Sequence, residues 1–426
     1  MRTDQFLAHH GVTRNPFAEE DAQTDQVFKA LCVDVRHPAW DKVYGDPADP
    51  ATSLVFGEKG AGKTAMRLQV AEAIERHNDA CAADADPPGR VWVVEYDDFN
   101  PLLDRFADRL PARKGRDATR VLEEWKLWDH MDGVLSIAVT DLLSSIAIGA
   151  LIGYFQAWDY LSWYLTYLVA FAGWVPYWVK WAHRKLLARG IAKNVRVLRR
   201  DRTMTDLLMR LRSQDLENQP LPNKPRTDDR YELLGKLQGV LRALGYGGVM
   251  VLVDRVDEPH LLGGRVEHIR DFVWSMLDNK FLRQPGIGFK LLLPAELLEH
   301  LNREDRDFHQ RARLDKQNVV PSLDWTADSL RDLAAARLAA CSAEGATPTL
   351  RDMIDPAVSD SRIAEALRTL RTPRHLFKFL FRLISTHCNT HTESDPVWRV
   401  GPETFEAVLA VYAREQASID RGLSAS

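Results

Sequence analysis

Cysteine is scarce in this chain, which has four among its 426 residues. They are far apart in the sequence, and none shows the paired spacing of a metal site or a disulfide framework: Cys32, Cys81, Cys341 and Cys388. This usage is typical of a protein in a reducing cytosol. It argues against a small secreted domain held together by disulfides.

The chain also lacks an excess of one charge, an internal repeat and a low-complexity tract. Its 56 basic and 60 acidic residues nearly balance, so no global field draws it toward nucleic acid. No hydrophobic run follows the early Arg2, so we expect no signal peptide. The mean hydropathy of −0.29 is ordinary for a soluble protein, and any membrane segment must be a local feature.

The first informative feature that is present is a phosphate-binding loop. The apolar run at 52–56 predicts a strand, GEKGAGKT follows it, and the next residues have helical spacing. The octapeptide satisfies G-x-x-x-x-G-K-[ST], in which glycines wrap phosphate oxygens, the lysine reaches the β- and γ-phosphates and the hydroxyl holds Mg²⁺. We therefore predict an ATP and Mg²⁺ site formed by Gly57, Glu58, Lys59, Gly60, Ala61, Gly62, Lys63 and Thr64.

Three more apolar runs, at 90–96, 248–253 and 287–294, predict further strands. The second is nearly continuous, as strands of parallel sheets buried on both faces are. The third has no polar residue at its end that could sense a γ-phosphate. No Asn-Lys-x-Asp guanine signature is present, which favours ATP over GTP. These runs indicate an α/β fold with a parallel sheet.

Acidic residues follow the strand at 248–253. Asp254 ends it, and we predict that its carboxylate binds Mg²⁺ opposite Thr64. Asp257 and Glu258 lie just beyond, and either could orient or deprotonate the attacking water.

After residue 320 the pattern becomes helical. One helix is predicted in LDWTADSLRDLAAARLAACSA, with a cap at Thr326 or Asp328. Two more follow, the second starting at Pro373. Arg374 lies in its first turn, where a lid arginine could reach the γ-phosphate; an ordinary solvated arginine fits the local sequence equally well.

Together GEKGAGKT, the strand with DRVDE, SLDWTADSLRDLAAARL and TPRHLFKFL resemble the STAND and Orc/Cdc6-like end of the AAA+ ATPases. They resemble even more the KAP group of P-loop NTPases, in which membrane helices are commonly inserted between the Walker A and Walker B motifs. The resemblance covers roughly residues 50–100 and 235–390. It implies a three-layer P-loop sandwich with a C-terminal helical lid, and Arg374 as the lid's sensor arginine. Arg255 departs from the family pattern, which has an acid directly after the metal aspartate, so we expect slow hydrolysis.

The resemblance also implies an oligomer, because lid ATPases commonly complete each site with an arginine from a neighbour. Arg311 and Arg313, just past the fourth predicted strand, are the candidates, with Arg374 acting within the subunit. A cation at the γ-phosphate stabilises the charge that develops there during transfer.

A long insertion separates the two halves of the predicted site. Lys63 and Asp254 are 191 residues apart (254 minus 63), and a βαβ unit needs only about 30. Residues 134–155 and 160–179 are each long enough to cross a bilayer, and tryptophans and tyrosines gather toward the ends of the second run. Residues 180–202 carry nine Lys and Arg against one acid, which marks a cytoplasmic side and attracts anionic lipid. We predict a membrane hairpin, with a buried hairpin of a soluble protein as the alternative.

These features predict five parts. Residues 1–50 lead into the NTPase, 51–125 form its first part, 126–230 are the insertion with its basic helix and linker, 231–320 form the second part, and 321–426 form the lid.

The leading function is a membrane-anchored ATPase acting as a switch, with the NTPase on the cytoplasmic face of a bacterial inner membrane. The rivals are a nucleotide-binding membrane scaffold with little hydrolysis and a soluble, DNA-associated ATPase. Nucleic acid is an unlikely partner, because no aromatic residues interleave the basic run past Trp181. The family resemblance suggests a role in phage defence or signalling.

Overall fold

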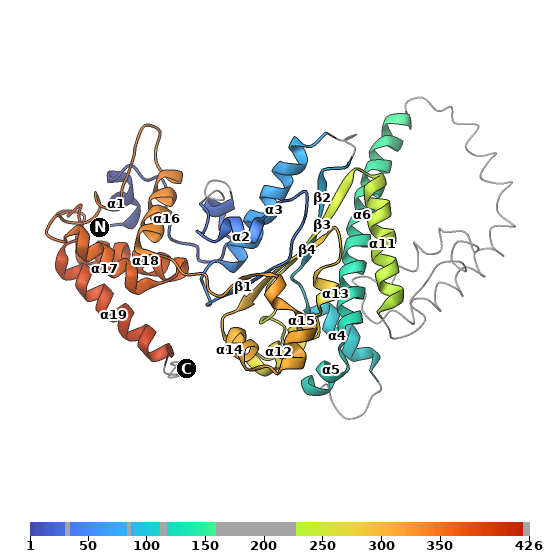
Figure 1. Cartoon of the computed structure of the whole chain (residues 1–426). Coiled ribbons are helices and arrows are strands. Elements are labelled where there is room, and N and C mark those ends of the chain that lie inside the picture. The colour runs from blue at the N-terminus through green and yellow to red at the C-terminus, as the bar shows by residue number, and fades with distance from the viewer. Residues whose placement is uncertain (30–34, 83–86, 111–116, 159–226, 421–426) are drawn as a thin grey trace.

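The computed structural model of the chain describes residues 1–29, 35–82, 87–110, 117–158 and 227–420 (Figure 1). Among them, five parallel strands form one sheet in the order β2-β3-β4-β1-β5. This confirms the predicted α/β class with a parallel sheet. A fifth strand, only three residues long, was not predicted. The strands are β1 (Ser53–Gly57), β2 (Arg90–Tyr96), β3 (Tyr246–Val253), β4 (Ile287–Pro294) and β5 (Asn318–Val320).

Two helices cover one face of the sheet. They are α2 (Trp40–Tyr44) and α3 (Lys63–Ala80). Trp40, Val70 and Ile74 pack against the alternate residues of β2 and β3 that face them. The other side chains of these strands point to the opposite face, because successive residues of a strand alternate in direction.

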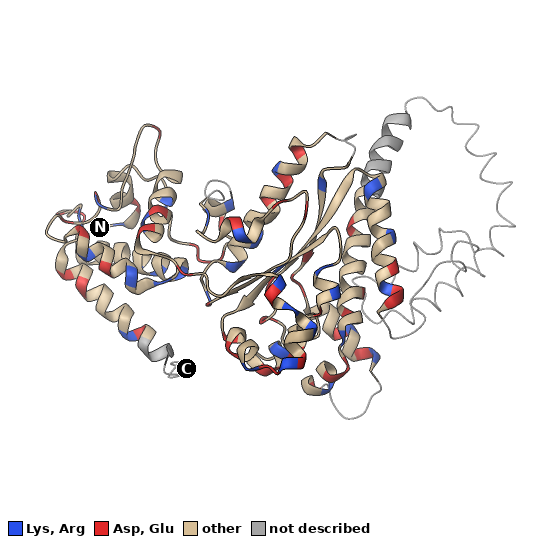
Figure 2. Ribbon diagram, viewed as in Figure 1, with Lys and Arg blue, Asp and Glu red and all other residues tan. Residues whose placement is uncertain are grey.

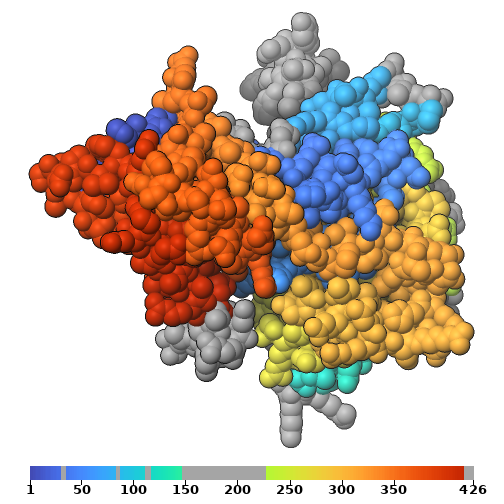
Figure 3. All heavy atoms as spheres, turned by 60° about the vertical axis from the view of Figure 1, so that its left-hand side comes forward, coloured from blue at the N-terminus to red at the C-terminus, as the bar shows by residue number. Residues whose placement is uncertain are grey.

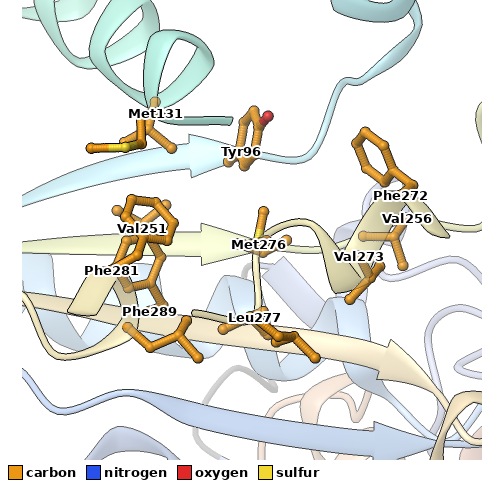
Figure 4. Packing of buried hydrophobic residues seen from close by; sticks show 14 of the residues in the cluster. Tyr96, Met131, Val251, Val256, Phe272, Val273, Met276, Leu277, Phe281 and Phe289 are labelled. Carbon is orange, nitrogen blue, oxygen red and sulfur yellow. The ribbon is translucent and has the colours of Figure 1, made fainter. Parts of the chain in front are cut away.

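The opposite face carries the larger core. In Figure 4, Tyr96 and Val251 from the strands lie close to Met131 and Phe281 from the covering helices, and Phe272 lies beyond the strand ends. Helices α6 and α11 stand side by side along this face (Figure 1). The helices of this side are α4 (Asn100–Arg109), α5 (Ala118–Glu124), α6 (Leu127–Trp158), α11 (Asp228–Ala243), α12 (Val266–Trp274), α13 (Asn279–Leu282), α14 (Glu296–Arg303) and α15 (Arg306–Ala312), followed by the short turn Leu314–Lys316.

Helix α6 corrects part of the expected first membrane span. Val134, Ile137, Ala138 and Leu142 are at most 6% exposed and belong to the core on the sheet. The beginning of the 134–155 run therefore packs against protein, because its apolar residues recur at helical spacing on the face that meets β2. The expected second span, 160–179, and the basic run, 180–202, lie outside the described residues. Within the described part of the chain, no helix is sufficiently long and apolar to traverse a bilayer.

A buried ion pair joins α6 to α11. Arg230 donates from Nε to Oδ1 of Asp132 at 2.8 Å and from Nη2 to Oδ2 at 2.7 Å. Both side chains are at most 2% exposed. The pair therefore fixes, inside the core of the sheet domain, the two helices that flank residues 159–226.

The C-terminal helices form a second lobe with its own core. They are α16 (Ala327–Ala340), α17 (Asp360–Leu370), α18 (Pro373–Thr390) and α19 (Pro402–Asp420). Thr326 caps α16 by accepting from the amide of Ser329, which confirms one of the two predicted caps, and α18 starts at Pro373 as expected. This lobe, orange to red in Figure 3, stands directly against the blue part of the sheet domain.

The first residues of the chain pack into the core of this second lobe. Helix α1 (Thr3–His9) contributes Phe6 to the lid core, and Phe17 stacks on Phe377 with ring centroids 6.2 Å apart. Arg337 holds Asp25 in a buried ion pair at 2.6 Å. The N-terminal segment and the C-terminal helices form this lobe together, and the sequence pattern of neither segment predicts that they associate.

Charges are spread over both lobes. Figure 2 shows acidic and basic residues interspersed along the helices, whereas the strands are mostly uncharged. This distribution along the ribbon agrees with the balanced composition.

Candidate functional site

The loop between β1 and α3 has the backbone of a phosphate-binding loop. Gly60 and Gly62 have φ angles of 88° and 97°, in the left-handed region that favours glycine. A Cβ on Gly60 would lie 2.6 Å from the Cβ of Arg374, so this glycine also allows the lid to approach. Helix α3 begins at Lys63, immediately after the loop. Since the first N–H groups of a helix have no partner within it, this end of α3 is suited to bind an anion.

Lys63 lies over the loop that precedes it. Its Nζ donates to the carbonyl oxygens of Gly57 at 2.6 Å and Glu58 at 3.1 Å. Burial lowers the pKa of Lys63, and the nearby charges of Asp257 and Asp254 act in the opposite direction. The ammonium is therefore placed at the loop and close to the acids that follow β3, as the motif requires.

Asp254 ends β3 and is 1% exposed. The Thr64 hydroxyl forms a hydrogen bond with its carboxylate, while Oδ2 has no hydrogen-bond partner. Burial raises the pKa of Asp254, and the Thr64 bond and the charge of Arg67 oppose that rise. A hydroxyl and a buried carboxylate oxygen with spare accepting capacity, beside a phosphate loop, are donors that Mg²⁺ accepts. Thr64 and Asp254 therefore fit the predicted ion.

The loop after β3 brings the two candidate carboxylates to the same cavity. Asp257 and Glu258 both line it, together with Lys63 and Asp254. Arg255 has a φ of 60°, and its Nε lies 3.2 Å from Oε1 of Glu258. Burial is the main cause that raises the pKa of Glu258, with Arg255 opposing it. The residue that departs from the family pattern thus pairs with one of the two candidates.

Arg374 reaches the same cavity from the lid. Its backbone amide donates to the carbonyl oxygen of Gly60 at 3.4 Å, and its Nε is buried without a hydrogen-bond partner. Helix α18 begins one residue earlier, with Pro373 at the first position and Thr372 as its cap. The backbone of Arg374 is therefore held against the loop, and its Nε–H is available to donate a hydrogen bond.

Arg313 and Arg311 lie elsewhere. Arg313 ends α15 with a φ of 45°, its Nε is 3.2 Å from Oδ1 of Asp315, and its side chain is 42% exposed. The guanidinium carbon of Arg311 lies 5.6 Å from the ring centre of Phe308. Neither arginine lines the cavity of its own chain.

Sequence reasoning missed the side of the cavity that the N-terminal segment and the lid supply. Phe28, Val35, His37, Trp325 and Phe377 line it. The indole N–H of Trp325 donates to the carbonyl oxygen of Ala61 in the loop at 2.9 Å, and its ring meets that of His37 edge-on at 5.0 Å. Phe28, Val35 and His37 belong to no quoted motif, and although Trp325 and Phe377 lie in two of them, nothing in those motifs assigns them to the cavity; only the tertiary structure identifies this wall.

Arg67 was also missed. It lies in the first turns of α3, is 2% exposed, and forms ion pairs with Glu95, Asp97 and Asp254. In the sequence it is one arginine on a predicted helix, which is most often a solvated side chain.

No family model matches the chain, and no curated protein does. Among solved structures, the chain is similar to that of the Orc1 protein of Aeropyrum pernix in complex with DNA. The two are 14% identical with a TM-score of 0.37, over 92% of this chain and 70% of that one.

Proposed function

We propose that the chain binds Mg-ATP and hydrolyses it slowly as a molecular switch. The observation that carries the proposal is one cavity into which the loop, the end of β3 and the lid all project. Lys63 is assigned to the β- and γ-phosphates, and Thr64 and Asp254 to Mg²⁺. Either Asp257 or Glu258 is assigned to the attacking water, and Arg374 to the γ-phosphate.

The remaining wall suits the base of the nucleotide. Phe28, Val35, Trp325 and Phe377 offer apolar and aromatic surface on the N-terminal and lid side of the phosphate loop. A heteroaromatic base packs well between such groups. Because these residues come from both lobes, a bound nucleotide would contact both lobes. Its γ-phosphate would interact with Arg374, so the position of the lid would depend on whether the γ-phosphate is present. That coupling is what a switch needs.

A direct binding assay tests the phosphate assignment. Lys63→Ala should abolish binding of a fluorescent ATP analogue, while Lys236→Ala, an exposed lysine of α11 paired with Glu232, should bind like the parent. Retained affinity in a folded Lys63→Ala protein would overturn the assignment.

Hydrolysis is tested separately. Asp254→Asn should weaken the Mg²⁺ dependence of ATP binding. One of the two variants Asp257→Asn and Glu258→Gln should bind ATP without hydrolysing it, and that variant identifies the catalytic carboxylate. Three variants that all hydrolyse at the parental rate would refute the placement of catalysis at this strand end.

A second candidate, a nucleotide-binding scaffold that barely hydrolyses, is favoured by the ion pair of Arg255 with Glu258. If Glu258 is the catalytic carboxylate, the guanidinium of Arg255 competes with the attacking water for it, and Arg255→Gln should raise turnover several-fold with unchanged nucleotide affinity. A parent that shows no turnover above the Lys63→Ala background, together with an inactive Arg255→Gln, supports the scaffold.

A shared site between subunits remains a proposal from the family resemblance. The exposure of Arg313 supports it, because an arginine outside its own cavity is available to a neighbour. Mixing Lys63→Ala with Arg313→Ala subunits should restore part of the activity. A strictly monomeric active enzyme would contradict the proposal.

Membrane attachment through residues 160–179, the part of the expected hairpin that lies outside the described residues, with contact of the basic run to lipid, is likewise proposed from the sequence. Its support is the charge-free run 160–179 beside nine basic residues. Protein expressed in bacteria should stay in the pellet after a carbonate wash, and full recovery without detergent would contradict anchoring and favour the DNA-associated alternative. Phage defence or signalling stays the process that the resemblance suggests.

A further inference from the structure

The side chain of Arg67 sits among three carboxylates next to the proposed Mg²⁺ site. Its Nη1 is 3.3 Å from Oε2 of Glu95, its Nη2 is 3.2 Å from Oδ2 of Asp97, and its Nε is 3.6 Å from Oδ2 of Asp254. The acids come from the ends of β2 and β3, which are neighbours in the sheet. The guanidinium therefore links helix α3 to the carboxyl ends of two strands.

These contacts differ from the buried pair that joins α6 and α11. Arg230 makes two directed hydrogen bonds to one carboxylate. By contrast, Nε and Nη1 of Arg67 and Oδ2 of Asp254 are buried without hydrogen-bond partners. Arg67 is thus held by charge rather than by directed bonds. A pairing built only for stability should have the bidentate geometry, since burial of loosely paired charge is costly.

The arrangement has a consequence for metal binding. Three carboxylates around one point are the donor type that divalent and trivalent cations take. Among the described residues, no group of three or more His, Cys, Asp or Glu side chains is placed to hold a metal ion. The guanidinium of Arg67 lies among the three acids, with a nitrogen within 3.6 Å of an oxygen of each.

We propose that Arg67 is a positioning residue for the metal acid. It stands in for a cation between Asp97 and Asp254, so that the nucleotide-free chain does not bind a divalent ion here. Asp254 is then held in place for the one Mg²⁺ that arrives with the phosphates. The role assigned to Asp254 rests on the proposed function, whereas the exclusion of metal from the free chain does not.

Metal binding to the nucleotide-free, full-length protein tests the proposal without using activity. Mn²⁺ binding, followed by electron paramagnetic resonance, should be about tenfold or more tighter in Arg67→Gln than in the parent, because one positive charge is removed from among three acids. Arg67→Lys keeps the charge and should exclude Mn²⁺ as the parent does. Arg76→Gln is the matched control, because Arg76 is an exposed arginine of the same helix that pairs with Glu72. Equal Mn²⁺ affinity in a folded Arg67→Gln and the parent would overturn the proposal.

A second variant covers the case in which Arg67→Gln does not fold. Asp97 is 17% exposed, and Asp97→Asn leaves Arg67 in place. The guanidinium then has one charged partner fewer and competes harder for Asp254. The Mg²⁺ concentration for half-maximal tightening of a fluorescent ADP analogue should rise about threefold or more, with affinity in EDTA unchanged. An unchanged Mg²⁺ requirement would count against Arg67 as a positioning residue. If the parent protein itself does not bind nucleotide, the proposed function is refuted. The Mn²⁺ experiment still tests the role of Arg67, because it uses no nucleotide.

Discussion

Replacing Arg230 by methionine removes one partner of the ion pair that joins α6 to α11 and leaves the Asp132 carboxylate buried. Two hydrogen bonds of 2.8 and 2.7 Å are lost, and the carboxylate that accepted them is at most 2% exposed. A charge-assisted hydrogen bond contributes roughly 1.5–3 kcal/mol, and breaking a buried pair from one side costs about 3–5 kcal/mol. We expect the free energy of unfolding to fall by about 3–5 kcal/mol for Arg230→Met and by a similar amount for Asp132→Leu.

The pair itself is isolated by a double-mutant cycle. The double variant with Arg230→Met and Asp132→Leu replaces both charges by apolar groups. Its loss in the free energy of unfolding should therefore be smaller, by about 2 kcal/mol or more, than the sum of the losses of the two single variants. Urea unfolding followed by far-ultraviolet circular dichroism measures each value. Lys236→Met on the same helix is the control, because its pairing with Glu232 is exposed and should contribute less than about 0.5 kcal/mol. If the free energy of unfolding of each single variant falls by less than about 1 kcal/mol, the inference that this pair holds the two helices together is refuted.

Two further predictions concern a buried lysine and the loop contact. Burial lowers the pKa of Lys290, 1% exposed in β4, to about 8. In the unfolded chain this lysine has the ordinary pKa of 10.5, so between pH 8 and 10.5 the unfolded state binds more protons than the folded state. The free energy of unfolding should therefore rise by roughly 3 kcal/mol as pH increases from about 8 to 10.5. Lys290→Met should lack this rise in urea titrations at the two pH values, and an identical rise in both proteins would contradict it. Trp325→Phe removes the donor to Ala61 and should cost about 1 kcal/mol, seen as an affinity for a fluorescent ATP analogue lower by roughly fivefold. Trp398→Phe, in the lid and away from the loop, is its control, and equal affinities would refute the contribution of the indole.

Local patterns were enough to predict the parts of the fold that depend on short stretches of chain. The bounds of β2 and β4 were predicted to the residue, because each is an apolar run ended by turn residues. Asp254 was placed correctly at the end of β3 because it is the first charged residue after a continuous apolar run. Strand β5 was missed because three residues are too few to show alternation.

The errors and omissions share a different cause. From Val134 onward, α6 has the apolar run of a lipid-facing helix, and only the neighbouring β2 and α11 show that the beginning of this run meets protein. Arg67 and Trp325 gain their roles from partners 30 or more residues away, at Asp97 and Ala61, which no local pattern encodes.

The lobe built from both ends of the chain has a consequence for synthesis. The ring of Phe6 packs edge-on against His387 with centroids 5.2 Å apart, although the second residue is made 381 residues later (387 minus 6). At a translation rate of about 5–20 residues per second, α1 waits on the order of 20–80 s for its partner helix. The cavity at the glycine-rich loop, which needs both the N-terminal segment and α18, therefore cannot close before α18 has been synthesised. A nascent chain stalled before residue 373 would present Phe6 and Phe17 to chaperones and proteases, and its cavity would lack the wall that α18 supplies.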